Sequence, residues 1–343
     1  MARGAEGAPV VLMARSSRNN LLMKFYVSSV VSLICFLVVG SRCLPAQSAP
    51  STDTAPSPLF AKTDLVVLPV SVTDSNGNFV SGLSSQSFRV YDNGRLQRVT
   101  AFQDGDTPVT VGLIVDHSRS MNPKLPEVAA AVSAFAQSSN PEDEMFVVDF
   151  NDDVTVELLN GKPFTNDAQE LAKAVSAIRA RGRTALYDAV AEGLLHLQLG
   201  QWDKKALIIV SDGGDNASQQ KYSQILALAQ RSQVSIYSVG LADADEEENP
   251  DVLRRLSKAT GGIAFFPSSL QGVADISRRI ARDLREQYTL GFVPEKTGSA
   301  DSFRQLTVKV AAPVHGKLRV RTRSGYFTSK PQPVAVNPGN SAL

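Results

Sequence analysis

The chain has 343 residues, of which 43% are hydrophobic, so it is long enough for about two domains with buried cores. Lys and Arg number 35 against 34 Asp and Glu, which gives a formal net charge of +1. This balance gives no electrostatic reason to expect nucleic acid as a partner, and we exclude nucleic-acid binding as a leading function.

Residues 1–48 have the pattern of a signal peptide for export. Basic residues extend to Lys24, an apolar stretch covers residues 25–40, and small residues surround Ser48, where we place cleavage. Met23 directly precedes Lys24, the last basic residue, so Met23 is a candidate for the true first residue and residues 1–22 for an extension called in error. An uncleaved anchor is the alternative, because the apolar stretch falls just short of the ~20 residues that span a bilayer. Contact with a membrane is expected only through that uncleaved segment.

Both cysteines, Cys35 and Cys43, lie within the signal segment, so a mature chain has none. Disulfide bonds and thiol chemistry are therefore not expected. Residues 49–61 follow the signal and are rich in Ser, Pro, Ala and Thr. This composition predicts a linker.

The first ordered segment is predicted to be a small antiparallel β unit over residues 62–107. Its strands are expected at Leu65–Val72, Phe88–Tyr91 and Gln97–Phe102, where apolar and β-branched residues recur. Asn76-Gly77 is a hairpin-turn signal after the first strand, and Asp92-Asn93-Gly94 is the turn between the other two.

Residues 108–287 alternate between apolar strands and helical stretches, which is the pattern of a mainly parallel sheet covered by helices on both faces. The predicted strands are Val109–Val115, Met145–Phe150, Ala206–Ser211, Val234–Val239 and Ile263–Phe266, with Val154–Leu159 as an antiparallel edge. The predicted helices are Pro126–Gln137, Asp167–Ile178, Ala185–Gln198, Tyr222–Ser232, Asp251–Ala259 and Val273–Arg285. The fold class is therefore α/β, with a doubly wound, Rossmann-like domain.

Residues 288–328 return to strands without helices between them. The predicted strands are Tyr288–Val293, Arg304–Val310, Lys317–Arg323 and Gly325–Phe327. We expect them to pair with residues 62–107 in one small β sandwich, into which the α/β domain is inserted. Two independent β appendages flanking the domain are the alternative. Residues 329–343, rich in Pro and Asn, are predicted to be disordered.

Polar residues follow two of the predicted parallel strands, at the point where each strand ends. Asp116-His117-Ser118-Arg119-Ser120 follows one strand, Asp212 follows another, and Thr184 lies between them in the chain. The carboxyl ends of strands in an open α/β sheet are where such folds place ligands. Carboxylate and hydroxyl oxygens suit hard divalent cations, so this edge is a candidate metal site.

These three segments, in this order, resemble the metal-ion-dependent adhesion site of the von Willebrand factor A-type (VWA) domain family, over residues 107–288. The resemblance implies that the ligands, direct or through water, are Asp116, Ser118, Ser120, Thr184 and Asp212. The cation would be Mg²⁺, or else Mn²⁺ or Ca²⁺. Few anionic groups touch such an ion, so it keeps a position for an anionic oxygen, which in the family is an Asp or Glu of a protein partner.

The flanking segments 82–91 and 288–292 resemble bacterial VWA-related proteins first grouped in Acidobacteria, which are exported. That resemblance implies a periplasmic, cell-surface or secreted location.

Other polar residues near the motif are not expected to bind the cation. Asp215 and Asn216 are predicted to shape the turn around Gly213-Gly214, and Asp188 to be a cap or a surface charge. Asp149 ends a strand and is expected at the edge of the site or in a supporting role. His117 occupies the spacer position of the motif and is expected to point toward solvent.

Binding of a protein partner, in adhesion or in the cell envelope, is therefore the expected function, and catalysis is not. The chain has no Gly-x-Ser-x-Gly and no Walker phosphate loop, and its three histidines, His117, His196 and His315, suit no serine triad. A structural envelope module whose metal only braces loops is one alternative, and a metal-dependent hydrolase is a lesser one. The acidic run Asp243–Glu248 is predicted to be solvated surface.

Overall fold

The computed structural model describes residues 65–157, 160–241, 249–295, 302–312 and 316–328, all within one compact unit, residues 61–343. The predicted signal peptide, linker and C-terminal tail lie outside the described residues, as do the acidic run 243–248 and His315. In the part of the chain that is described, no helix has both the length and the apolar character needed to cross a membrane.

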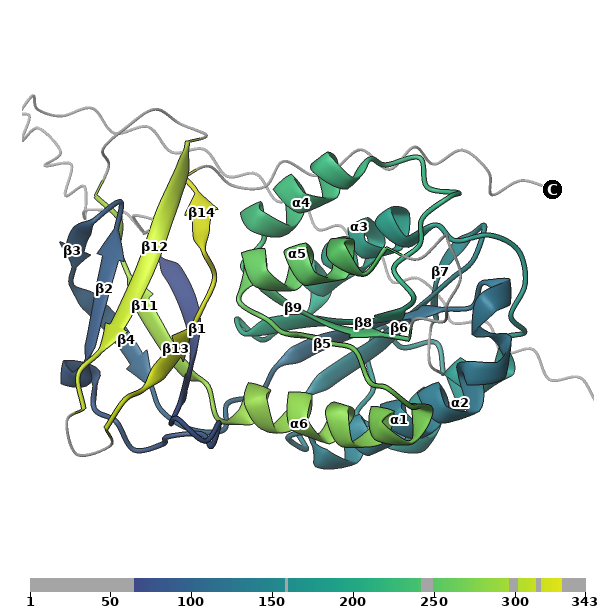
Figure 1. The fold of residues 1–343 in the computed structure, drawn as a ribbon, viewed down its shortest axis with the longest axis horizontal. Coiled ribbons are helices and arrows are strands. Elements are labelled where there is room, and N and C mark those ends of the chain that lie inside the picture. Colours follow the sequence, from purple (N-terminus) through teal and green to yellow (C-terminus); the bar gives the residue numbers. More distant parts are fainter. Residues whose placement is uncertain (1–64, 158–159, 242–248, 296–301, 313–315, 329–343) are drawn as a thin grey trace, which may run out of the picture. The chain divides into compact units, whose positions relative to one another are not determined.

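A six-stranded sheet forms the centre of the α/β domain, in the order β10-β9-β8-β5-β6-β7 (Figure 1). Its strands are β5 (Thr110–Asp116), β6 (Glu144–Phe150), β7 (Val154–Glu157), β8 (Lys205–Ser211), β9 (Val234–Gly240) and β10 (Ala264–Phe265). Every neighbouring pair is parallel except β6 and β7, which are antiparallel with Val148 opposite Val156. The predicted mainly parallel sheet with an antiparallel edge strand is confirmed.

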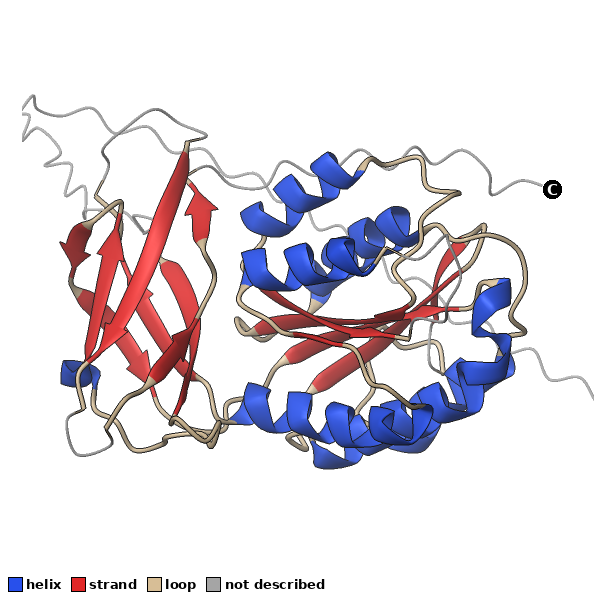
Figure 2. Ribbon diagram, in the orientation of Figure 1, coloured by secondary structure: helices blue, strands red, loops and turns tan. Residues whose placement is uncertain are grey.

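Helices cover both faces of this sheet (Figure 2). One face carries α1 (Leu125–Ser138), α2 (Ala168–Ala177) and α6 (Val273–Arg285), and the other carries α3 (Leu186–His196), α4 (Tyr222–Arg231) and α5 (Pro250–Thr260). Side chains of β5 alternate between the two cores, with Leu113 in the first and Ile114 in the second. Gly112 has no room for a side chain, because Leu207 and Phe146 come within 2.5 Å of the place of a β-carbon.

Two four-stranded sheets form a β sandwich with a core of its own, in the orders β13-β1-β11-β4 and β14-β12-β2-β3. Its strands are β1 (Val66–Thr73), β2 (Phe88–Asp92), β3 (Arg95–Gln97), β4 (Val99–Gln103), β11 (Tyr288–Phe292), β12 (Phe303–Val310), β13 (Arg319–Arg321) and β14 (Gly325–Phe327). In each sheet, strands from before the α/β domain pair with strands from after it, with Leu68 opposite Leu290 and Val90 opposite Val308. The two flanking segments therefore build one sandwich rather than separate appendages.

One predicted strand is wrong. We expected Gln97–Phe102 to be a single strand, but β3 ends at Gln97 and β4 begins at Val99, and the two belong to different sheets. Arg98 is the residue at which the chain crosses from one sheet to the other. Both strands turn one face toward the same core, so the alternation of residues does not reveal the crossing. The predicted strand Lys317–Arg323 is likewise shortened to β13, because the chain then crosses to β14.

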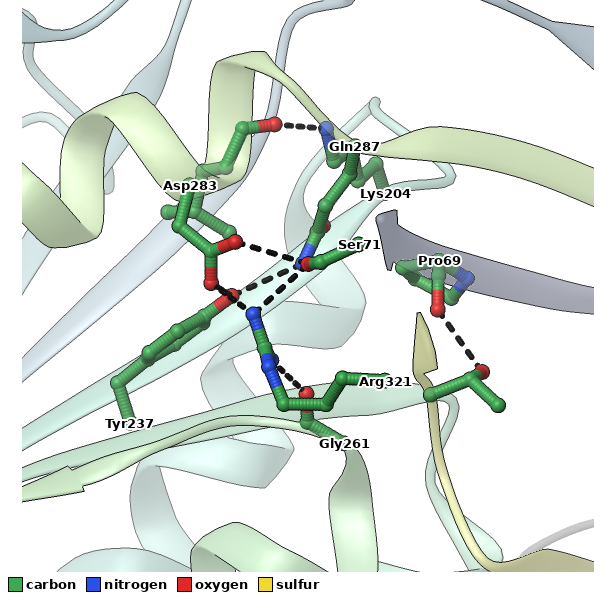
Figure 3. Close-up of polar contacts among 10 residues, drawn as sticks. Pro69, Ser71, Lys204, Tyr237, Gly261, Asp283, Gln287 and Arg321 are labelled. Carbon is green, nitrogen blue, oxygen red and sulfur yellow. Dashed lines mark hydrogen bonds and ion pairs between the residues drawn. The ribbon is translucent and has the colours of Figure 1, made fainter. Parts of the chain in front are cut away.

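Buried polar residues connect the sandwich to the α/β domain (Figure 3). The Asp283 carboxylate of α6 accepts hydrogen bonds from Ser71 Oγ of β1 at 2.8 Å and from Tyr237 Oη of β9 at 2.7 Å, and it pairs with Arg321 of β13. Gln287 Nε2 donates to Tyr237 Oη at 2.9 Å. Burial and the Asp283 charge raise the pKa of Tyr237 far above its ordinary value. The hydroxyl therefore stays neutral and acts as a donor to Asp283.

Candidate functional site

The sheet brings the two predicted carboxylates to one edge. Asp116 is the last residue of β5, Asp212 directly follows β8, and β5 and β8 are parallel neighbours with Val115 opposite Val210. Ser118 and Ser120 lie in the loop after β5 and in the 3-10 helix η2 (Arg119–Lys124). The structure therefore places four of the five predicted ligands where two strands end, at the edge that open α/β sheets use for ligands.

Hydrogen bonds join these four residues into one cluster. Asp116 Oδ1 accepts from the backbone N–H of Ser118 at 2.8 Å. Ser118 Oγ lies 3.2 Å from Ser120 Oγ, which in turn donates to Asp212 Oδ2 at 2.8 Å. The side-chain donors to a cation at this place would all be oxygens, which is the set that Mg²⁺, Mn²⁺ and Ca²⁺ prefer.

Thr184 is held against the loop that follows Asp212. Its backbone N–H donates to Asn216 Oδ1 at 2.9 Å, and its carbonyl accepts from the backbone N–H groups of Asn216 and Ala217 at 2.9 and 3.1 Å. Thr184 is only 7% exposed, and among the described residues its hydroxyl has no hydrogen-bond partner. The fifth predicted ligand therefore offers an uncommitted oxygen.

Asp116 is fully buried, and burial raises the pKa of its carboxyl to about 6. Hydrogen bonds from Ser118 and Ser211 oppose this rise, while the negative charge of Asp212 adds to it. Within the described ranges, neither Asp116 nor Asp212 forms an ion pair with a basic side chain. A divalent cation between the two carboxylates would offset both the desolvation and the repulsion, so the residues present fit such an ion.

Hydroxyl groups rather than acidic or imidazole groups dominate this donor set. No cluster of three or more His, Cys, Asp or Glu side chains that could hold a metal occurs within the described ranges. The carboxylates of Asp116 and Asp212 are therefore too few to hold a metal ion by themselves. A cation here would depend on the serine and threonine hydroxyls and on water, which is compatible with Mg²⁺ because that ion keeps several waters.

His117 does not point toward solvent, contrary to the sequence prediction. It is fully buried, its Nδ1 pairs with the Asp149 carboxylate of β6, and its Nε2 lies 2.9 Å from the carbonyl of Val175 in α2. Burial lowers the pKa of His117, but the hydrogen bond and charge of Asp149 outweigh burial and raise it above its ordinary value. His117 therefore ties the loop after β5 to its neighbours and is not available to a ligand.

Two other acidic residues near the site, Asp215 and Asp188, accept hydrogen bonds from backbone groups. Asp215 Oδ1 accepts from the backbone N–H of Tyr187 at 3.2 Å and from Ser218 Oγ at 2.5 Å, so it caps the start of α3. The Asp188 carboxylate accepts from the backbone N–H groups of Gln219 and Gln220 at 2.7 and 2.9 Å.

Two residues of the site were missing from the prediction or were given another role. Ser211 Oγ donates to Asp116 Oδ2 at 2.7 Å, and Asn216, expected only in a turn, orients Thr184. Ser211 had a local signal, since a hydroxyl ending a buried strand needs a partner. Asn216 had none, because its partner lies 32 positions earlier in the chain.

Comparisons with known proteins concern the α/β domain. A model of the von Willebrand factor type A domain matches residues 111–279, from β5 into α6. An uncharacterised Synechocystis protein is 22% identical over 167 residues, which is 48% of this chain and 39% of that protein, so the chain spans well under half of this relative.

Solved structures with a similar fold include two bacterial ones. The von Willebrand factor type A protein from Catenulispora acidiphila is 14% identical, with a TM-score of 0.47 over 78% of this chain and 75% of that one. The vWF domain of the type V pilus tip protein Mfa5 from Porphyromonas gingivalis is 12% identical, with a TM-score of 0.43 over 52% of this chain and 95% of that one. The family-model match and the α/β topology together identify residues 111–279 of this chain as a von Willebrand factor type A domain.

Proposed function

We propose that this chain binds a protein partner through a divalent cation held by Asp116, Ser118, Ser120, Thr184 and Asp212. Mg²⁺ is the first candidate, with Mn²⁺ or Ca²⁺ as alternatives. The observation that carries the proposal is the hydrogen-bonded cluster of carboxylate and hydroxyl oxygens at the ends of β5 and β8. At most two carboxylates balance the charge of such an ion, so an acidic side chain from a partner is a favourable further ligand.

Each surrounding residue has a distinct task in this proposal. Ser211 and the backbone of Ser118 hold the buried Asp116 carboxylate, and Asn216 fixes the backbone of Thr184. When bound, the cation supplies positive charge and an open coordination position. The buried pair of His117 and Asp149 anchors the loop that carries the two serines.

Partner binding is favoured over serine-hydrolase chemistry by the position of His117. A serine nucleophile needs a histidine that accepts its proton, and both ring nitrogens of His117 are already engaged by Asp149 and Val175. VWA domains are in general protein-interaction modules, which agrees with this choice. Export to the periplasm, the cell surface or the medium, inferred from the N-terminal segment, is part of the same proposal.

The test is isothermal titration of Mg²⁺, and separately of Mn²⁺, into chelator-treated protein beginning at Ala49. We expect saturable one-site binding that Thr184→Val and Asp212→Asn each abolish. Asp275→Asn is the control, because Asp275 is an exposed acidic residue of α6 outside the cluster. Binding that survives both site variants, or no binding by the unaltered protein, would contradict the proposed cation site. Binding with no chelator-sensitive partner in a subsequent pull-down would favour a metal that only braces the loops.

A further inference from the structure

Four exposed arginines lie on the two chain segments that lead into the candidate cation site. Arg119 lies between Ser118 and Ser120, and the other three alternate along the segment that leads to Thr184. We name this set the arginine rim, consisting of Arg119, Arg179, Arg181 and Arg183. The proposed ligand set contains none of them, although three of the ligands, Ser118, Ser120 and Thr184, are their immediate neighbours in the chain.

Backbone hydrogen bonds bring the two parts of the rim together. The backbone N–H of Arg181 donates to the carbonyl of His117 at 2.8 Å, and the backbone N–H of Arg119 donates to the carbonyl of Gly182 at 3.4 Å. The segment before Thr184 therefore lies along the loop that carries Ser118. Positive charges separated by about 60 positions in the chain are in this way gathered beside one cluster of oxygens.

The segment is held in place by Asp152. A β-carbon at Gly182, where φ is +72°, would overlap Asp152 Oδ2, so the carboxylate packs directly on the glycine. Asp152 also accepts from the backbone N–H and the Nε of Arg183, at 3.1 and 2.9 Å. These hydrogen bonds hold the pKa of Asp152 below its ordinary value, so it stays a carboxylate at neutral pH.

Asp152 uses only one of the four guanidinium groups. Within the described ranges, the side chains of Arg119, Arg179 and Arg181 form no ion pair, hydrogen bond or ring contact. The acidic residues Asp188 and Asp215 belong to the other flank of Thr184, where backbone N–H groups engage them. The surface beside the site is thus basic on the flank that follows α2.

We propose that the arginine rim selects a partner segment with several acidic residues, rather than one isolated Asp or Glu. The inference rests on the proposed function, in which one partner carboxylate meets the cation. Carboxylates that flank it would then meet guanidinium groups, which bind carboxylates through paired hydrogen bonds. Exposed ion pairs contribute little singly, so the rim adds selectivity and faster association more than raw affinity.

The test compares two fluorescent peptides of equal length by anisotropy, in Mg²⁺ and in chelator. One has a single central Glu among Ser and Gly, and the other has Glu at the centre and at two flanking alternate positions. The proteins are the unaltered chain from Ala49, Arg119→Gln, Arg181→Gln and the control Arg282→Gln. Arg282 is exposed on α6 and borders a cavity of about 480 Å³ with Asp106, near the start of β5 rather than its end.

We expect the three-Glu peptide to bind the unaltered protein about three- to tenfold more tightly than the one-Glu peptide at low salt. Each rim variant should reduce this ratio, Arg282→Gln should not, and added NaCl should reduce it as well. A ratio that both rim variants retain, or a ratio of one in the unaltered protein, overturns the inference. So does tighter binding of a sulfated polysaccharide than of the three-Glu peptide.

The chelator arm tests the proposed function separately. Loss of one-Glu binding in chelator supports a cation that receives a carboxylate, whereas binding that chelator does not change counts against it. The ratio of the two peptides measured in chelator still reports on the rim, since guanidinium groups need no metal. Failure of the cation proposal and failure of the rim proposal therefore give different results.

Discussion

Asp283 near the end of α6, whose carboxylate is buried, and the partly exposed Arg321 on β13 form an ion pair between the α/β domain and the sandwich (Figure 3). The carboxylate also accepts from Ser71 of β1 and Tyr237 of β9, so one side chain connects four elements. Because Asp283 is 1% exposed, its charge is stabilised by these partners and not by water. This polar contact joins the two domains. Losing one of its partners would leave a buried charge unpaired and would destabilise the folded protein.

Replacing Asp283 with Ala should lower the free energy of unfolding by about 3–5 kcal/mol, because Arg321 and the Tyr237 hydroxyl would lose their partner inside the protein. Urea denaturation followed by circular dichroism measures this. Asp275→Ala, on the exposed face of the same helix, is the control and should change stability by less than about 1 kcal/mol. A similarly small effect of Asp283→Ala would show that the junction contributes little.

Replacing Tyr326 with Phe should destabilise the sandwich by about 1.5–3 kcal/mol, the usual range for a hydrogen bond to a charged group. Its hydroxyl donates to Asp92 Oδ2 at 2.9 Å, beside the two bonds that Arg304 makes to the same carboxylate at 2.8 Å. Tyr91→Phe on β2 is the matched control, because Tyr91 contacts Lys309 through its ring. Equal thermal midpoints for the two variants would contradict the expected contribution.

Stability should fall as pH rises from about 4 to about 6 because of Asp143. Burial raises the pKa of its carboxyl from 3.8 to about 6, so the folded state binds more protons than the unfolded state in this window. The protonated Asp143 therefore adds at most about 3 kcal/mol to the free energy of unfolding, relative to its value at neutral pH. This contribution is fully present below about pH 4 and lost above about pH 6.

Asp143→Asn isolates this effect from that of Asp116, whose pKa is also raised to about 6. The asparagine Oδ1 can still accept from the backbone N–H of Val109, a bond of 2.8 Å in the protein. Urea unfolding of both proteins between pH 4 and 7 should show a flatter curve for the variant. A constant difference between the two curves would rule out this role of Asp143.

Replacing Gly182 with Ala should weaken Mg²⁺ binding as well as stability. Both Gly182 and Gly77 have positive φ, at +72° and +86°, so alanine at either position costs about 1–2 kcal/mol. At Gly182 the added carbon overlaps Asp152 and should displace the segment that carries Thr184. At Gly77 nothing lies within 4 Å of the place of a β-carbon, so that variant is the control. Titration calorimetry of both variants decides this, and equal Mg²⁺ affinities would contradict it.

The sequence predicted the elements and most of the candidate site because these depend on local patterns. Asp116, Ser118 and Ser120 follow one apolar strand and Asp212 follows another, so their common edge could be inferred from strand order alone. The structure places all five predicted ligand residues near one edge, while their binding of a metal stays a prediction.

The remaining features depend on residues that are distant in the chain. The burial of His117 requires Asp149 on another strand, and the position of Thr184 requires Asn216 in a later loop. The crossing at Arg98 depends on which sheet each strand joins, and no alternation of residues records that choice. Such contacts form only when tertiary packing is complete, so one sequence alone does not reveal them.

The pairing of β4 with β11 also bears on the order of folding. Phe102 lies opposite Leu290, so the whole α/β domain is the loop that joins two neighbouring strands. Closing a flexible loop on the order of 200 residues costs roughly 5 kcal/mol in chain entropy, whereas a folded domain holds its ends in fixed positions. The α/β domain should therefore fold first and act as the template on which the sandwich closes, which makes β4 and β11 a late pair in the folding reaction.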